Sequence, residues 1–290
     1  MNNKQPTILV TGAEGQLGKA LQLLAPEFPG YHFLFTTKKD LNIEQPAEME
    51  KYFSANSIDF CINCAAYTAV DKAESEKEEA FYVNAYAVAC IADICHKNKT
   101  QLIHISTDYV FDGTAFEPYK ETHRTSPVSV YGKSKMHGEE LALRNEPSAI
   151  IIRTSWLYSE FKNNFVKTML RLMKEKESIN VVNDQSGSPT YAADLAAAIM
   201  QVIASGKSKE SPGIYHYTDA GFTTWYGFAL AIKKLAGSNC IVNPITTEQY
   251  PTAAKRPGYS VLDTAKIKGV FGVSVPVWEE SLKQCLQQLT

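Results

Sequence analysis

The chain has 290 residues, of which 44% are hydrophobic and 21% are charged, a balance typical of a globular protein that excludes bulk disorder. Its 29 basic and 31 acidic residues leave a net charge of −2, which excludes the basic surface that attracts nucleic acids and anionic membranes. No apolar run approaches the roughly 18–20 residues of a membrane span, and the polar start from Met1 to Pro6 predicts no signal peptide. We therefore expect a cytoplasmic protein of one or two domains.

The first half of the sequence alternates strand-like and helix-like segments. Apolar residues run almost without interruption in the segments predicted as strands, at 7–11, 32–36, 59–66, 101–106 and 149–155. Helices are predicted at 16–25, 74–97 and 130–144. Strands that are apolar throughout and separated by helices are typical of a parallel sheet covered on both faces, so we predict an α/β fold with a doubly wound parallel sheet.

After residue 155 the pattern is looser. Helices are predicted at 163–175, 191–204 and 224–236, and the stretches between them are rich in turn residues and aromatic residues. This organisation predicts a larger domain over residues 1–155 and a smaller C-terminal α/β lobe over residues 156–290, partly interleaved with the first domain.

A glycine-rich turn follows the first predicted strand and opens the first helix. Gly12, Gly15 and Gly18 are spaced as G-x-x-G-x-x-G. The first glycine permits a tight turn, the second lets the backbone approach a pyrophosphate, and the third allows close packing of helix on strand. Free N–H groups at the helix start attract the phosphates. Such glycines can also form a plain turn, but their place between strand and helix favours an NAD(P)-binding domain.

The choice of dinucleotide depends on the end of the second strand. An NAD site usually places Asp or Glu there to bind the ribose 2′-hydroxyl. Here the strand ends in Thr36, Thr37, Lys38 and Lys39, with Asp40 just beyond. The lysines suit a 2′-phosphate, although they also suit a solvated loop, so we predict NADPH as the preferred cofactor with NADH tolerated.

Tyr131 and Lys135 form a Y-x-x-x-K pair on the helix predicted at 130–144. Four residues is just over one helical turn, so the phenol and the ammonium share a face, and a nearby cation favours the ionised phenol. The pair alone is common by chance and is also typical of a helix surface. Ser106, Thr107 and Asp108 end the fourth strand at the sheet edge where open α/β folds bind ligands, and a hydroxyl there can orient a substrate carbonyl. The glycine loop, the hydroxyl at the end of the fourth strand and the Y-x-x-x-K pair occur in this order, and a chance match to all three is a poor explanation.

Longer strings carry a family resemblance through most of the chain. The most specific are V-D-K-A-E-S-E at 70–76 and S-T-D-Y-V-F at 106–111. Others are N-C-A-A-Y-T-A at 63–69, V-Y-G-K-S-K at 130–135, R-T-S-W-L-Y at 153–158, N-N-F at 163–165, N-D-Q-S-G-S-P-T at 183–190 and K-R-P at 255–257. With the glycine loop and the Y-x-x-x-K pair, they make the chain similar to the extended short-chain dehydrogenase/reductase superfamily, which has the Rossmann fold, and within it to the dTDP-4-dehydrorhamnose reductases.

The resemblance implies reduction of the C4 keto group of dTDP-4-dehydro-L-rhamnose by NAD(P)H, the last step of dTDP-L-rhamnose synthesis for cell-surface polysaccharide. It implies that Tyr131 protonates the developing alkoxide, that Lys135 holds the nicotinamide ribose and lowers the pKa of the tyrosine, and that Thr107 binds the carbonyl oxygen. Positions matching the family's cofactor contacts are Gly15, Gln16, Leu17, Asp40, Leu41, Ala66, Tyr67 and Thr68. Positions matching its substrate contacts are Thr107, Asp108 and Trp156. Arg256 is placed for the nucleotide diphosphate, because a guanidinium suits phosphate oxygens.

Alternatives stay open for single residues and for the whole chain. Core packing also explains Trp156, and a structural salt bridge also explains Arg256. The non-catalytic regulatory subunit of methionine adenosyltransferase, which keeps the dinucleotide fold, is similar to this family. An epimerase or dehydratase acting on sugar nucleotides and retaining its NAD is another alternative. The complete set of Thr107, Tyr131 and Lys135 favours the reductase.

Metal binding and assembly are less defined by the sequence. Cys61 and Cys64 form a C-x-x-C, the spacing of redox dithiols and half zinc sites, but they lie in a predicted buried strand without a second pair, so we interpret them as small core residues. Some relatives dimerise through magnesium held by acidic side chains. The segment 190–194 lacks a clear glutamate, so no metal ligand is assigned and magnesium is left open. A monomer and a homodimer both remain open.

Overall fold

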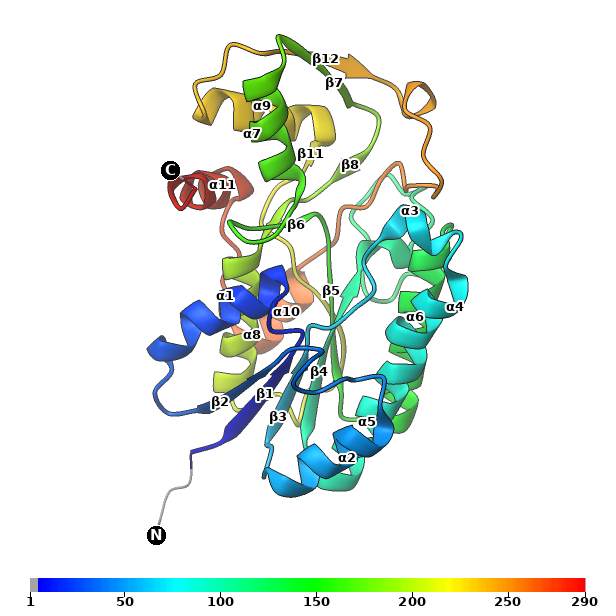
Figure 1. Cartoon of the computed structure of the whole chain (residues 1–290), viewed down its shortest axis with the longest axis vertical. Helices are drawn as coiled ribbons and strands as arrows, with labels where there is room; N and C mark the ends of the chain where they lie inside the picture. Colours follow the sequence, from blue (N-terminus) through cyan, green and yellow to red (C-terminus); the bar gives the residue numbers. More distant parts are fainter. Residues whose placement is uncertain (1–4, 290) are drawn as a thin grey trace.

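The centre of the molecule is a parallel sheet (Figure 1). The structure is a computed structural model that describes residues 5–289. Residues 1–4 of the polar N-terminal segment lie outside the described residues. The strand order is β2-β1-β3-β4-β5-β10, and every neighbouring pair is parallel. The bounds are β1 (Thr7–Thr11), β2 (His32–Thr36), β3 (Phe60–Asn63), β4 (Gln101–Thr107), β5 (Ile150–Thr154) and β10 (Gly213–His216). Because β2 and β3 lie on opposite sides of β1, the winding reverses there, and the predicted doubly wound sheet is confirmed.

Helices cover both faces of the sheet (Figure 1). Successive residues of a strand point to opposite faces, so Ile8 and Val10 pack in one buried cluster and Leu9 in the other. The first cluster includes residues of α1 (Gln16–Leu24), α8 (Ala192–Ala204) and α10 (Ala265–Phe271). The second includes residues of α2 (Pro46–Ala55), α5 (Ala87–Asn98) and α6 (Val130–Asn145).

A smaller lobe lies beyond the carboxyl edge of the sheet (Figure 1). Its buried cluster is built from α7 (Phe165–Glu175), α9 (Trp225–Leu235), α11 (Trp278–Gln287) and the parallel pair β7 (Ser178–Val182) and β12 (Ile241–Ile245). Two short pairs complete it: β6 (Leu157–Tyr158) with β9 (Thr190–Tyr191), and β8 (Ser186–Gly187) with β11 (Thr223–Thr224). Single turns of 3-10 helix lie at η1 (Ala25–Glu27), η3 (Asp108–Val110) and η4 (Thr247–Gln249).

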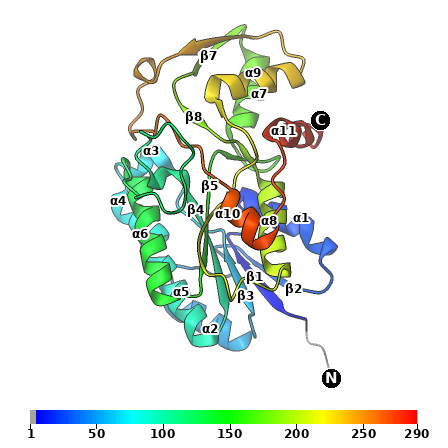
Figure 2. The ribbon, with the colours of Figure 1, turned by 180° about the vertical axis from the view of Figure 1, so that it is seen from behind.

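Segments from the second half of the chain return to the sheet, as the view from behind shows (Figure 2). Strand β10 pairs with β5 at the sheet edge, and α8 packs against α1. Helix α10 packs against β10. The domain boundary placed at residue 155 stays a prediction, since the chain crosses between the lobes more than once.

The long helix predicted at 74–97 is confirmed from Lys77 onward, but residues 74–76 are not helical and one turn of the helix is not α-helical. Two short helices, α3 (Val70–Ala73) and α4 (Lys77–Phe81), are followed by a π-helical turn, η2 (Tyr82–Tyr86), before α5 begins. The turn is wider than an α-helix, and it presents the buried Asn84 toward the site described below.

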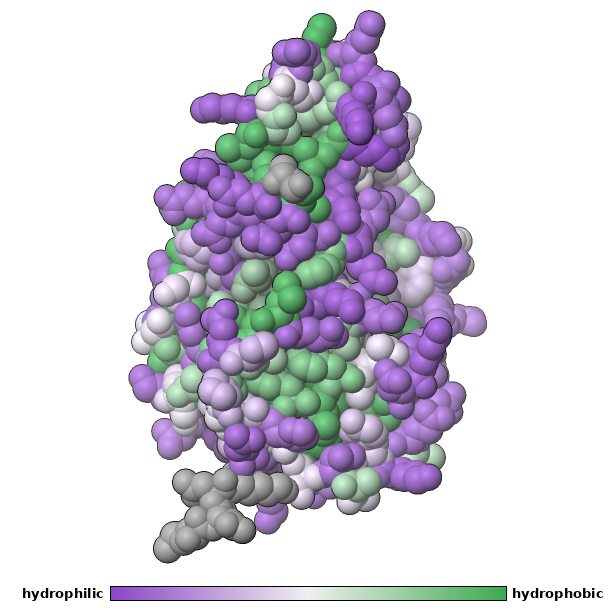
Figure 3. All heavy atoms as spheres, turned by 60° about the vertical axis from the view of Figure 1, so that its left-hand side comes forward, coloured by the Kyte–Doolittle hydropathy of each residue, from purple (hydrophilic) through white to green (hydrophobic). Residues whose placement is uncertain are grey.

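The face shown in Figure 3 is mostly hydrophilic, with apolar patches between the polar side chains. Within residues 5–289, no helix is both long enough and apolar enough to cross a membrane.

Candidate active site

The predicted site residues follow the carboxyl ends of neighbouring strands. Gly12 follows β1, Ala66 lies three residues after β3, Asp108 follows β4, and Trp156 lies two residues after β5. Because these strands are parallel and adjacent, their carboxyl ends meet at one edge, beside the point where the winding reverses. This is the position at which open α/β sheets bind their ligands.

The glycine loop brings backbone close to backbone. Gly12 has φ +67°, and a Cβ on it would lie 2.7 Å from the main-chain nitrogen of Ala65 in the loop after β3. A Cβ on Gly18 would lie 2.5 Å from the Gly12 carbonyl oxygen, so helix α1 packs tightly on the loop. No side chain caps the start of α1 at Gly15, which leaves N–H groups of the first turn for an anion. The loop therefore fits the pyrophosphate of a dinucleotide.

A cavity of about 370 Å³ opens beside this loop. Five of the residues predicted to contact cofactor line it: Gly12, Gly15, Leu41, Ala66 and Tyr67. Thr37 and Lys38, from the loop after β2, also line it. In this structure Lys38 pairs with Glu44 at 2.5 Å, an exposed ion pair at the cavity wall.

The other predicted cofactor residues lie around the cavity with different contacts. Leu17 and Gly18 are buried, and Leu17 packs in the core beneath α1. The Asp40 carboxylate accepts hydrogen bonds from the Thr37 N–H (3.0 Å) and hydroxyl (2.7 Å), which hold its pKa below the ordinary value and shape the loop after β2. Thr68 is exposed.

Gln16 joins the glycine loop to the smaller lobe. Its side-chain oxygen accepts hydrogen bonds from the Ser159 hydroxyl at 2.9 Å and from the Asn164 amide at 3.0 Å. Its amide donates to the carbonyl of Leu157 at 3.3 Å. A residue expected to contact cofactor thus also fixes the loop relative to the second lobe.

Thr107, Asp108 and Tyr131 form the polar cluster at the end of β4. The Thr107 hydroxyl donates to the Asp108 carboxylate at 3.0 Å and is hydrogen-bonded to the Tyr131 hydroxyl. Burial raises the pKa of Asp108 to about 6, and burial raises the pKa of Tyr131 to about 12, with the Thr107 hydrogen bond opposing the shift. Hydrogen bonds from the side chains of Ser260 and Thr107 to the carboxylate oppose the rise in the pKa of Asp108. The cluster therefore gathers the hydroxyl groups of Thr107 and Tyr131 at the end of β4, where they can bind a polar ligand.

Lys135 shares the inner face of α6 with Tyr131 but directs its amine elsewhere. Its Nζ donates to the main-chain oxygen of Ile105 at 2.6 Å and lies 3.3 Å from Nε2 of His104. Burial lowers the pKa of Lys135 to about 8, while the charge of Glu139 acts in the opposite direction. The expected lowering of the tyrosine pKa by Lys135 is not found in this structure, in which burial dominates at Tyr131.

The V-D-K-A-E string positions both α6 and the C-terminal segment. Glu74 accepts a hydrogen bond from the N–H of Val130 at 2.8 Å, which stabilises the start of the helix carrying Tyr131. Asp71 forms a two-point ion pair with Arg256, at 2.7 Å and 3.1 Å. Of the two interpretations of Arg256, the structure contains the salt bridge; contact with a diphosphate stays a prediction.

Trp156 lies in a strained but well-supported conformation. Its φ of +47° is in the left-handed region, which side chains rarely adopt. Its indole stacks on Trp225 with ring centroids 3.5 Å apart, and a Cβ on Gly187 would lie 2.5 Å from it. Strain of this kind persists only where the surroundings fix it, and it is common at binding sites. Trp156 thus packs against the core of the smaller lobe, as the core-packing interpretation of this residue predicted. Its contact with substrate stays a prediction.

Sequence reasoning missed Asn84, which connects the cofactor cavity to α6. Its side-chain oxygen accepts from the N–H of Tyr67 at 2.9 Å, and its amide donates to the Tyr67 carbonyl and to the Ser134 hydroxyl, each at 3.0 Å. It is fully buried. The one available signal was that Asn84 interrupts the otherwise apolar and aromatic run at 80–92 of the predicted helix.

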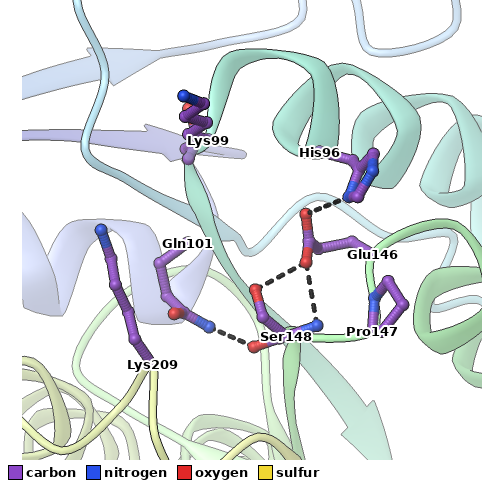
Figure 4. Close-up of a pocket in the computed structure, with 8 residues that line it drawn as sticks. His96, Lys99, Gln101, Glu146, Pro147, Ser148 and Lys209 are labelled. Carbon is purple, nitrogen blue, oxygen red and sulfur yellow. Dashed lines mark hydrogen bonds and ion pairs between the residues drawn. The ribbon is translucent and has the colours of Figure 1, made fainter.

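A second pocket, of about 440 Å³, lies at the opposite, amino edge of the sheet (Figure 4). It surrounds Glu146, which accepts hydrogen bonds from the main chain and hydroxyl of Ser148 at 2.9 Å and 2.6 Å and pairs with His96 at 3.3 Å. These contacts shape the turn before β5, and the pocket is remote from the Tyr131 cluster.

The cysteines and acidic residues do not gather into a metal site in the described part of the chain. Cys61 is buried in the core, and burial raises the pKa of the partly buried Cys64 thiol. Among residues 5–289, no group of three or more His, Cys, Asp or Glu side chains is arranged to hold a metal ion.

A dinucleotide loop, a threonine at the end of the fourth strand and a Tyr–Lys pair on the following helix place the chain in the class of short-chain dehydrogenases and reductases. The family described as RmlD substrate binding domain matches residues 6–290. A dTDP-4-dehydrorhamnose reductase of Aggregatibacter actinomycetemcomitans is 42% identical over 285 residues, covering 95% of this chain and 97% of its own. The chain belongs to the dTDP-4-dehydrorhamnose reductase family.

Solved structures agree with this membership. The dTDP-4-dehydrorhamnose reductase of Clostridium acetobutylicum superposes with a TM-score of 0.92 at 40% identity, over 98% of this chain and 99% of its own. The Bacillus anthracis enzyme, solved in complex with NADP, superposes with a TM-score of 0.93 at 39% identity, over 98% of this chain and 100% of its own.

Proposed function

We propose that this chain is an NAD(P)H-dependent reductase that converts the C4 ketone of dTDP-4-dehydro-L-rhamnose into the alcohol of dTDP-L-rhamnose. The observation that carries the proposal is the cluster of Thr107, Asp108, Tyr131 and Lys135 at the carboxyl edge of the sheet, next to a cavity beside a dinucleotide loop. The activity named for relatives that match over nearly the whole chain supports this substrate.

Each side chain of the cluster has a defined part in this proposal. The hydroxyls of Thr107 and Tyr131 bind the keto oxygen and orient the carbonyl. Tyr131 delivers its proton to that oxygen as negative charge develops; its pKa of about 12 in the unliganded site keeps the phenol protonated at neutral pH. Lys135 binds the nicotinamide ribose, and its positive charge favours the tyrosinate formed after proton transfer.

The residues present fit a dinucleotide. Gly12, Gly15 and the uncapped start of α1 would hold the pyrophosphate, and Leu41 and Tyr67 line the adjoining cavity. NAD(P)H supplies the hydride when it is bound. Lys38 is available for a 2′-phosphate if it leaves Glu44, which supports NADPH as the preferred form and NADH as usable. The NADP complex of the Bacillus anthracis relative supports the same preference.

Consumption of the reduced cofactor tests the proposal. The protein is mixed with enzymatically prepared dTDP-4-dehydro-L-rhamnose and either NADPH or NADH, and nicotinamide absorbance and products are followed. Stoichiometric oxidation with dTDP-L-rhamnose as product supports the proposal, with the faster rate for NADPH. No oxidation by a protein that binds NADPH overturns it in favour of a regulatory binding role, and sugar conversion without net oxidation favours an epimerase.

The proposal also includes a cytoplasmic location. It includes a homodimer as one of the two oligomeric states that the sequence leaves open. Activity in the soluble fraction of gently lysed cells, separated from periplasmic and membrane markers, tests the location. Light scattering distinguishes a single chain of 32.2 kDa from a pair, with and without magnesium.

A further inference from the structure

A chain of buried hydrogen bonds runs from the glycine loop to Lys135. Thr11, the last residue of β1, donates from its hydroxyl to the side-chain oxygen of Asn63 at 2.6 Å. The Asn63 amide nitrogen lies 3.1 Å from Nδ1 of His104, and Nε2 of the same ring lies 3.3 Å from Nζ of Lys135. Thr11, Asn63, His104 and Lys135 are all buried, with His104 fully enclosed.

The contacts of Asn63 define which ring nitrogen of His104 carries hydrogen. The N–H of Ala65 lies 3.2 Å from the Asn63 side-chain oxygen, and a main-chain N–H is always a donor. The amide oxygen of Asn63 therefore faces Ala65 and Thr11, and its NH₂ group faces His104. Nδ1 of His104 must then accept, which places the hydrogen of the neutral ring on Nε2, facing Lys135.

The amine of Lys135 consequently meets a donor on one side and an acceptor on the other. It donates to the Ile105 carbonyl at 2.6 Å, while the ring N–H of His104 points at its nitrogen. An ammonium has no lone pair to accept this hydrogen, whereas a neutral amine has one. The arrangement makes the ammonium, which the proposed reduction uses, less stable than it would be beside a second acceptor, so Lys135 loses its charge at a lower pH.

The other groups around Lys135 do not reverse this preference. On α6, the charge of Glu139 raises the pKa of Lys135, but burial has the larger effect, and the carboxylate is paired with Arg153 of β5 at 2.6 Å. Tyr131, on the same helix, has a raised pKa and is protonated. The loop after β3 contributes Cys64, whose raised pKa keeps the thiol neutral. The π-helical turn faces α6 with the uncharged Asn84. After β4, the carboxylate of Asp108 bonds Thr107.

We propose that His104 is a positioning residue for the proposed reduction: it holds the Lys135 amine against the Ile105 carbonyl and, through its Nε2–H, disfavours the charged form. The inference rests on the proposed function for its kinetic consequence, and on geometry alone for the tautomer. The lowered pKa of Lys135, about 8, agrees with it. Burial also lowers the pKa of His104 well below its usual range, so the ring stays neutral at physiological pH.

Nitrogen NMR of the histidine rings tests the tautomer without any turnover. In the full chain labelled with ¹⁵N-histidine and assigned by the loss of signals in His104→Gln, we expect His104 as the Nε2–H tautomer, unchanged from about pH 6 to about pH 9. An Nδ1–H tautomer, or an imidazolium in this range, would overturn the proposal whether or not the chain reduces the sugar.

The pH profile of kcat/KM tests the effect on Lys135. Glutamine at position 104 can turn its oxygen to the amine, so His104→Gln should move the basic limb of the profile upward by about one pH unit. His216→Gln is the matched control, because His216 is also buried on the sheet but contacts Arg153 and Tyr119 instead. The His216→Gln control should leave the basic limb of the profile in place.

An unmoved basic limb in an active His104→Gln enzyme contradicts the proposal. If His104→Gln does not fold, the histidine signals are assigned with the other five His→Gln variants and the tautomer decides. Absence of turnover in the wild type refutes the proposed function and leaves the tautomer test intact.

Discussion

The pair between Glu139 and Arg153 permits a quantitative test of the packing beneath the site. Both side chains are 3% exposed, and Arg153 bonds Glu139 through Nη2 at 2.6 Å and through Nε at 2.9 Å. The Ser106 hydroxyl donates to the same carboxylate. Glu139→Gln preserves the size of the side chain but leaves a buried guanidinium without its counter-charge. Removing one partner of such a pair costs about 3–5 kcal/mol of unfolding free energy.

Urea denaturation of matched variants measures this cost. Glu175→Gln is the control, since Glu175 pairs with Arg171 at a similar 2.8 Å but both side chains are more than half exposed. An exposed helical pair of this kind contributes about 0.3–0.5 kcal/mol. A loss below about 1 kcal/mol in Glu139→Gln, or one equal to that of Glu175→Gln, would refute the reasoning that desolvation makes this pair sensitive.

The same variant has a second, kinetic consequence. The charge of Glu139 raises the pKa of Lys135 against the larger effect of burial. Its removal therefore lowers that pKa, and the basic limb of the kcat/KM profile should move to lower pH, opposite to the direction expected for His104→Gln. A limb that moves upward in Glu139→Gln would show that the carboxylate does not act on the amine.

Three further predictions concern the site. Tyr131→Phe should lower turnover about 10²–10⁴-fold, the usual effect of losing a general acid, with NADPH binding by calorimetry retained; a near-wild-type rate would exclude it as proton donor. Burial raises the pKa of Asp108 from 3.8 to about 6, so its ionisation opposes folding increasingly as the pH rises through this window. Asp108→Asn should therefore raise the unfolding free energy by about 3 kcal/mol near pH 8 and by little near pH 4, and equal changes at both would contradict this. Gly187→Ala should displace Trp156, change the near-ultraviolet circular dichroism and raise KM for the nucleotide sugar about tenfold. Gly258→Ala, whose Cβ meets nothing closer than 3.6 Å, should do neither, and an unchanged KM in Gly187→Ala would argue against Trp156 as a substrate contact.

Local patterns predicted the sheet and the place of the site. Gly12, Gly15 and Gly18 lie in one short turn between strand and helix, so their spacing is visible in the local sequence. Tyr131 and Lys135 are about one helical turn apart, so their shared helix face is visible in the same way. Apolar runs predicted five of the six strands of the central sheet, because a parallel strand buried on both faces leaves a continuous signal.

Contacts between distant segments were not predictable in the same way. Asp71 and Arg256 are 185 residues apart, and β10 joins β5 from the second half of the chain. Nothing in either local sequence specifies the partner, because tertiary packing decides it. The direction of the Lys135 amine belongs to the same group: the helix fixes its face, but His104 and the Ile105 carbonyl fix its contacts.

The transfer of hydride to the sugar is the central claim, and labelled cofactor tests it most directly. The protein is given dTDP-4-dehydro-L-rhamnose with NADPH that carries deuterium on the transferred position of the nicotinamide, and the product is analysed by mass spectrometry and NMR. We predict dTDP-L-rhamnose with deuterium at C4 of the sugar, in equal amount to the NADPH oxidised. A product without deuterium, or sugar conversion without oxidation of NADPH, would contradict the assignment of this chain as a C4 reductase.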